Sequence, residues 1–262
     1  MRLSVRGFTL LELIVVIAII GVLSIIILPS FKNALDKANA TKVSQNIINT
    51  IKRYDVFAKW EFEEGSGLIA KDTAVNPVDN TVQNNATIPG SGVSRSNNTY
   101  ASSSQSSLLF DGTNYLTTVN NTYPKLDNSS FSFSMWLRRT GGFGANSRFL
   151  SKWGGGGACG YFIATFSAPN DTLGFYFGDS STAFTSLSIK DQLWHNLMLS
   201  YDVTTSKLVV YVDSKMVGSY NMTCPLSGTD SNPLVIGGYI GGSNHFIGNI
   251  DDVYYFKDVI VK

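Results

Sequence analysis

The stretch FSFSMWLRR, residues 131–139, shows most directly how this chain folds. Successive side chains of a β-strand point to opposite faces of a sheet, so alternate residues share a face. The first face of this stretch carries four apolar side chains: Phe131, Phe133, Met135 and Leu137. The second carries Ser132, Ser134, Trp136 and Arg138. The alternation predicts a half-buried strand, with one face in a hydrophobic core and the other partly exposed.

Short runs of the same kind continue on both sides of this strand. The segment SKLVVYVDSKMVGSYN, 206–221, predicts two strands that turn at residues 213–215. Further runs are SLLFDGTNYLTTV (107–119), YFIATF (161–166), TLGFYFG (172–178), WHNLMLSYD (194–202), PLVIGG (233–238) and FIGNIDDVYYF (246–256). About a dozen strands with no helix between them predict an antiparallel sandwich or jelly roll.

The N-terminus has a different pattern. RGFTLLELIVVIAIIG, 6–21, begins an apolar run in which Glu12 is the only ionisable residue between Phe8 and Leu28. About 20 apolar residues suffice to cross a membrane as a helix. Arg2 and Arg6 precede the run, which predicts a cytoplasmic N-terminus and an external remainder. The run is too long for an ordinary cleaved signal peptide, and a plain membrane anchor gives no reason for the charge at Glu12.

The same stretch resembles the processing and assembly motif of type IV prepilins and of the pseudopilins of type II secretion. The resemblance implies a leader peptide, 1–7, which a prepilin peptidase removes between Gly7 and Phe8. It implies that Phe8 is then N-methylated and that Glu12 pairs with the N-terminal amine of a neighbouring subunit. An unpaired buried charge is costly, so this pairing would reward correct assembly. The chain would lie in the cytoplasmic membrane first and in an extracellular filament afterwards, among copies of itself or other pilins.

The apolar run is expected to continue into a long helix over residues 8–58. Pro29 is expected to bend it, because proline lacks an N–H group and clashes with the preceding turn. Apolar residues between Phe31 and Tyr54 recur at spacings near three and four, which predicts a face that packs on the chain's own domain or on neighbouring helices. The predicted fold class is therefore α+β, a long N-terminal helix followed by an antiparallel β-sandwich over 59–262.

A second resemblance covers most of that sandwich. The segments that carry it are WEFEEGSGLIAKD (60–72), LLFDGTNYLTT (108–118), FSFSMWLRR (131–139), FLSKWGGGGACGYFI (149–163), LWHNLMLSYDVTTSKLVVYVDSKMVGS (193–219) and FIGNIDDVYYF (246–256). In this order they are similar to laminin-G-like, concanavalin-A-like jelly-roll domains. The resemblance implies carbohydrates or other extracellular ligands, and often calcium, although a fold alone does not set a function.

Composition and motifs argue against several activities. With a net charge of +1, the chain has no basic field for a nucleic acid. Every glutamate lies at or before residue 64, so the sandwich lacks the glutamate pair of a retaining glycosidase. His195 is expected in a core strand and His245 in a loop, without the order of a Ser-His-Asp triad or the spacing of a zinc site. We therefore expect no enzyme activity.

Two candidate ligand sites remain. Carboxylates in the first and last strand segments could hold a structural Ca²⁺, or could only cap turns: Glu63, Asp72, Asp251 and Asp252. Aromatic side chains in or beside glycine-rich segments could stack on sugars, or could only anchor loops: Phe143, Trp153 and Tyr239, with His245 beside them. The two cysteines, Cys159 and Cys224, could form a disulfide in an oxidising compartment, although sequence alone does not show that they meet.

Together these features predict a structural subunit of a type IV pilus with a lectin-like domain on its surface. Two alternatives stay open: a minor pilin that acts as a glycan-binding adhesin, and a type II secretion pseudopilin.

We expect the substitution Glu12→Ala to reduce filaments below detection by electron microscopy, because an unpaired buried amine costs about 3 kcal/mol or more at every subunit contact. The domain after the helix should stay folded, with a wild-type proteolysis pattern. Glu12→Asp, which keeps the charge, is the matched control. Normal filaments from Glu12→Ala would contradict the role assigned to this carboxylate.

Overall fold

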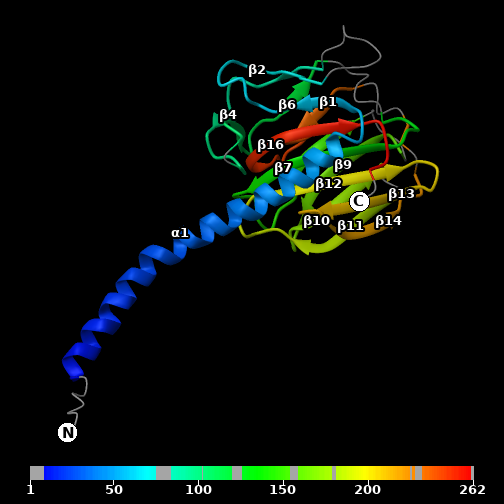
Figure 1. Ribbon diagram of the computed structural model, residues 1–262. Coiled ribbons are helices and arrows are strands. Elements are labelled where there is room, and N and C mark those ends of the chain that lie inside the picture. Colours follow the sequence, from blue (N-terminus) through cyan, green and yellow to red (C-terminus); the bar gives the residue numbers. More distant parts are fainter. Residues whose placement is uncertain are drawn as a thin grey trace, which may run out of the picture. The chain divides into compact units, whose positions relative to one another are not determined.

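The computed structural model describes residues 9–74, 84–101, 103–119, 126–153, 159–178, 181–224, 226–227 and 232–260 (Figure 1). In this part of the chain, helix α1, Leu10–Ile51, is followed by strands only. The strands are β1 Val56–Trp60, β2 Ile69–Ala70, β3 Ala86–Thr87, β4 Val93–Ser96, β5 Ser107–Asp111, β6 Leu116–Thr118, β7 Phe131–Arg139, β8 Ser147–Trp153, β9 Tyr161–Ser167, β10 Thr172–Phe177, β11 Ser181–Ser188, β12 His195–Asp202, β13 Lys207–Val212, β14 Lys215–Asn221, β15 Leu234–Ile236 and β16 Ile247–Phe256.

The strands form two antiparallel sheets. Sheet A has the order β14-β13-β12-β7-β16-β5-β4, and β1 also pairs with β16. Sheet B has the order β11-β10-β9-β8-β15-β6-β3-β2. The predicted antiparallel β-sandwich is confirmed.

Aromatic side chains fill the space between the two sheets. From β7 in sheet A, the rings of Phe131 and Phe133 pack on Phe162 of β9 in sheet B, with centroid distances of 5.7 and 6.2 Å. Phe177 and Tyr201 join the same cluster. The apolar face of FSFSMWLRR is therefore the core face, as its alternation predicts.

The second face of β7 is buried as well, so the prediction of a half-exposed strand is wrong. Only Arg138 of this strand is partly exposed. Trp136 stacks on Tyr100 at a centroid distance of 4.2 Å, and both belong to a hydrophobic cluster with Ala40 and Ile47 of α1. The C-terminal part of α1 thus covers the outer face of sheet A, which alternation within one strand does not indicate.

Helix α1 is shorter than the predicted span, because it ends at Ile51 and β1 already begins at Val56. The helix continues through Pro29 without a break, and the bend expected there stays a prediction. The chain divides between Asn39 and Ala40 into two compact units, so the last turns of α1 belong to the same unit as the sandwich.

The β13–β14 hairpin follows the predicted pattern. Asp213 and Ser214 form its turn with φ of 50° and 66°, and two successive positive values suit a tight turn between antiparallel strands. Asp213 Oδ1 accepts a hydrogen bond from the backbone N–H of Asn196 at the start of β12. The turn is therefore tied to the neighbouring strand as well as to its own hairpin.

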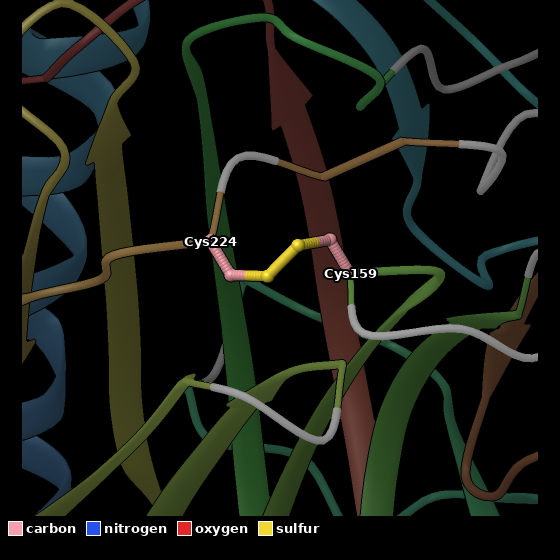
Figure 2. The surroundings of a disulfide bond; sticks show 2 residues. All are labelled: Cys159 and Cys224. Atoms are coloured by element: carbon pink, nitrogen blue, oxygen red, sulfur yellow. A yellow bond between two sulfur atoms is a disulfide. The ribbon is translucent and has the colours of Figure 1, made fainter.

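Cys159 and Cys224 form a disulfide, with 5.5 Å between their Cα atoms (Figure 2). Cys159 precedes β9 of sheet B, and Cys224 follows β14 of sheet A, so the bridge joins segments that belong to different sheets. The backbone N–H of Ser227 donates to the carbonyl oxygen of Cys159, which adds a second tie at this place.

Replacing both cysteines with serine should lower the free energy of unfolding by about 4 kcal/mol, because the bridge closes a long loop in the unfolded chain. Urea unfolding of the full chain in detergent, followed by tryptophan fluorescence, would measure the loss. Dithiothreitol should shift the wild-type midpoint in the same direction and leave the double variant unchanged. A wild-type midpoint that does not respond to full reduction would contradict this contribution.

Candidate functional sites

Glu12 takes part in a capping arrangement at the start of α1. The backbone N–H and the hydroxyl of Thr9 both donate to Glu12 Oε2 at 2.8 Å, and the N–H of Glu12 lies 3.3 Å from Thr9 Oγ1. This is a capping box, which satisfies N–H groups that have no partner within the helix. Its sequence signal, threonine followed three residues later by glutamate, was missed in the sequence analysis.

The predicted processing site, Gly7 and Phe8, lies outside the described residues. The helix that follows has large exposed apolar side chains, from Leu10 at 77 % to Ile25 at 75 %. Among the helical residues whose side chains are described, no stretch is long and apolar enough to cross a membrane. Phe8 and the side chains of residues 26–28, which complete the predicted span, are not among them.

The outer face of sheet B is defined by the alternation in β9. Phe162 and Phe166 belong to the core, so the residues between and beside them point away from it: Tyr161, Ile163 and Thr165. In the β8–β9 register, Trp153 pairs with Tyr161 and Arg148 pairs with Thr165. Trp153 and Arg148 therefore share the outer face with their partners.

On this face, three aromatic rings and one guanidinium form a continuous series. Trp153 stacks on Tyr161 at 4.6 Å between centroids with an interplanar angle of 11°. Trp153 also lies 6.3 Å from the ring of Tyr239, and the Cζ atom of Arg148 is 4.2 Å from the Tyr239 centroid. All four side chains are partly exposed. We call Tyr161, Trp153, Tyr239 and Arg148 the aromatic row.

The structure brings together two of the predicted sugar-stacking residues, Trp153 and Tyr239. His245 is nearby, since its backbone pairs with that of Arg148 and its ring is 4.9 Å from Tyr115. Burial and the charge of Arg148 lower the pKa of His245, which favours the neutral imidazole. His245 therefore lies beside the aromatic row without adding a positive charge to it.

Phe143 lies at a different place. It packs on the guanidinium of Arg139, 4.8 Å from Cζ to the ring centroid, and the other flank of that guanidinium contacts Phe166 at 4.6 Å. Arg139 forms a fully buried ion pair with Asp171 at 2.7 Å. Removing either partner of a buried ion pair leaves an unpaired buried charge, which strongly destabilises a fold. We therefore assign this group a structural role.

Sequence reasoning missed Arg148 and Tyr161 as members of the row. The sequence did contain a signal for Tyr161. FLSKW ends with Trp153 and YFIATF begins with Tyr161, so antiparallel pairing of these two successive strands brings the two aromatic residues together. Arg148 had no such signal, because the register shifts between Arg148 and Leu150 and breaks the simple alternation.

The four predicted calcium ligands do not form one group. Ser104 Oγ lies 3.1 Å from Glu63 Oε1 and 2.8 Å from Asp251 Oδ2, which places these two acids together. Asp72 instead accepts backbone N–H groups, among them that of Lys59 at 2.9 Å. Within the described ranges, no three His, Cys, Asp or Glu side chains are arranged to hold a metal ion.

Burial changes the protonation of the paired acids. It raises the pKa of Asp251 to about 9, with further contributions from the charges of Asp252 and Glu63. Burial is also the main reason that the pKa of Asp252 rises to about 6, although a hydrogen bond from Tyr100 acts in the opposite direction. Asp251 therefore keeps its proton at neutral pH. Calcium binding by these acids stays a prediction.

His195 lies between two carboxylates. Its Nδ1 is 2.7 Å from Asp213 Oδ2, and its Nε2 is 3.0 Å from Asp191 Oδ1. Burial alone would lower the pKa of His195, but these two partners raise it to about 9. Both ring nitrogens are engaged, so the residue ties the start of β12 to the β13–β14 turn.

Comparisons with known proteins agree with both halves of this description. Residues 110–261 match the family described as the concanavalin A-like lectin/glucanases superfamily, and residues 2–28 match the prokaryotic N-terminal methylation motif. The first match covers more than half of the chain, which therefore belongs to the concanavalin A-like lectin/glucanases superfamily. Its N-terminus carries the type IV pilin-like methylation motif.

Similar curated proteins align over short segments. The type II secretion system core protein G of Klebsiella michiganensis is 41 % identical over 56 residues, which are 21 % of this chain and 39 % of that protein. The type IV major alpha-pilin of Moraxella bovis is 51 % identical over 39 residues, which are 15 % of this chain and 24 % of that protein. The chain thus spans well under half the length of either relative.

A solved structure resembles the sandwich. Domain 4 of the extracellular arabinanase AbnA from Geobacillus stearothermophilus, in complex with arabinotriose, superposes with a TM-score of 0.58 and 14 % identity. The match covers 79 % of this chain and 95 % of that domain. At this level of identity the likeness concerns the fold.

We expect Asp251→Asn to be at least as stable as the wild type at pH 8. The folded-state pKa of Asp251 is about 9, well above the value of 3.8 for an unperturbed aspartate, so its contribution to stability falls as pH rises between these values. Asparagine resembles the protonated carboxyl: its Oδ1 can accept from the backbone N–H of Asp252, and its Nδ2 can donate to Ser104 Oγ, whose hydroxyl can then donate to Glu63 Oε1. Urea unfolding at pH 5 and pH 8 would measure the effect.

The difference between Asp251→Asn and wild-type stability should grow in favour of the variant from pH 5 to pH 8. Asp251→Ala is the control, because it leaves Ser104 and the backbone N–H of Asp252 without this hydrogen-bond partner and should be destabilised at both pH values. A variant that loses stability only at the higher pH would show that Asp251 is ionised in the folded chain.

Proposed function

We propose that this chain is a subunit of a type IV pilus or a closely related filament and that its sandwich domain binds glycans. The N-terminal methylation motif and the exposed apolar side chains of α1 support the assembly role. In this proposal, a prepilin peptidase cuts between Gly7 and Phe8, and Glu12 pairs with the new amine of a neighbour. The chain passes from the cytoplasmic membrane to the extracellular filament.

The observation that carries the binding role is the difference between the two outer faces of the sandwich. Trp136 on sheet A is buried beneath α1, whereas the aromatic row on sheet B is partly exposed. Exposed aromatic rings can stack on the apolar faces of sugars. A domain of the same fold is known in complex with arabinotriose, which supports a carbohydrate ligand for this fold. The proposed role is binding without hydrolysis.

The primary candidate is a subunit that builds the whole filament, and a minor pilin adhesin is the alternative that the aromatic row favours. The similarity to a type II secretion core protein makes a pseudopilin the third. These three candidates are distinguished by mass spectrometry of filaments sheared from the producing cells, which gives the amount of this chain and its N-terminal residue. A dominant chain that begins at methylated Phe8 supports the first, and a rare chain at the filament surface supports the second.

Loss of secretion with unchanged surface filaments would instead support the pseudopilin. If the chain keeps residues 1–7 and never enters a filament, the assembly proposal fails.

Binding is tested with the full chain in detergent on a panel of immobilised oligosaccharides. Trp153→Ala should lower the affinity for any bound glycan about fivefold or more, because one stacked aromatic residue typically supplies about 1 kcal/mol. Phe184→Ala is the matched control, since Phe184 is an exposed aromatic residue outside the row. Equal binding by all three proteins would place the ligand elsewhere, and a panel with no bound glycan would contradict the binding role.

A further inference from the structure

Arg148 reaches the outer face of sheet B because of an irregularity in β8. The register with β9 shifts between Arg148 and Leu150. Phe149 and Leu150 are both fully buried in the core, although they are neighbours in sequence. A bulge of this kind re-aims a side chain, and here it leaves Arg148 on the same face as Trp153.

The guanidinium of Arg148 is held in place on several sides. It stacks on Tyr239 at 4.2 Å, and Nη1 donates to the carbonyl oxygen of Ser243 at 2.8 Å. The backbone N–H of the same residue donates to the carbonyl oxygen of Asn244 at 3.0 Å. A side chain that is already ordered loses less conformational entropy when it binds a ligand.

The positive charge of Arg148 is not neutralised by the surrounding side chains that the structure describes. None of the ion pairs found among the described residues includes Arg148. His245 favours its neutral form, so it adds no second positive charge next to Arg148. An arginine has five N–H donors in a planar fork, and the fork matches a carboxylate well.

The row runs from Tyr161 through Trp153 and Tyr239 to Arg148. Its successive ring centroids are 4.6 and 6.3 Å apart, and Arg148 Cζ lies 4.2 Å from the Tyr239 centroid, so the row is at most about 15 Å long. Tyr239 contacts both Trp153 and Arg148. The row therefore has the length of a short oligosaccharide, with aromatic rings along it and a cation at one end.

We infer that the aromatic row binds an acidic oligosaccharide, in which Arg148 pairs with the carboxylate of a sugar acid while Trp153 and Tyr239 lie against the sugar rings. The inference rests on the proposed glycan binding and assigns its ligand class and its specificity residue. A hexuronic acid and a sialic acid both supply this carboxylate, so both are tested.

The test measures the affinity of the full chain in detergent for two pairs of ligands. Trigalacturonate is compared with galactotriose, and 3′-sialyllactose is compared with lactose. At least one acid should bind about tenfold or more tightly than its neutral partner, as expected for hydrogen bonds to a charged group. The preference should weaken in 0.5 M NaCl, because part of it is an ion pair.

Arg148→Gln should remove the preference for the acid, so that the acid and its neutral partner bind with nearly equal affinity. Arg138→Gln is the matched control, because Arg138 lies on the outer face of sheet A. Arg148→Lys keeps the charge without the planar fork and should retain part of the preference. Should Arg148→Gln fail to fold, Arg148→Lys and the salt dependence of the wild type still decide.

Equal binding of acidic and neutral partners, or a preference that survives in Arg148→Gln, would overturn the inference while the proposed glycan binding stands. If none of the four ligands binds and the wider panel is also negative, both fail. Tighter binding of both neutral sugars than of their acids would likewise overturn the assignment of Arg148.

Discussion

The organisation of this protein depends on the burial of Trp136 between sheet A and helix α1. This side chain projects from the outer face of β7, where it stacks on Tyr100 at 4.2 Å and joins a cluster with Ala40 and Ile47. Large aromatic side chains dominate the energy of such contacts because of the apolar area that they remove from water. Since the helix lies on one outer face of the sandwich, the glycan binding that we propose is assigned to the other.

Polar groups make this junction specific. Tyr100 donates to Asp252 and also has a hydrogen bond with Ser44 of α1, and the neighbouring acid Asp251 is fully buried. Buried polar groups are costly unless they are hydrogen-bonded, so each of these contacts favours one arrangement of helix and sheet. Burial and the charge of Asp252 also raise the pKa of Tyr100, which keeps its hydroxyl a donor. Asp251 and Asp252 thus have a structural role at this junction.

The sequence predicted the sandwich well because alternation is a local signal. In FSFSMWLRR it identified the core face correctly, and the hairpin at Asp213 and Ser214 followed from its polar turn. It failed for the outer face of β7, since alternation shows that two faces differ but not what covers them. In the candidate site, Trp153 and Tyr239 were named from their residue type, whereas Arg148 was missed because a bulge moved it onto that face.

By itself the sequence determined the class of each part: the N-terminal motif with Glu12, the long helix, and the strands of a concanavalin-A-like domain. These features depend on residues close together in the chain. Only the tertiary structure decided which face of the sandwich helix α1 covers, that Cys159 meets Cys224, and that Asp251 keeps its proton. Those properties depend on burial and on contacts between residues far apart in sequence. Neither can be predicted from the local pattern of a strand or helix.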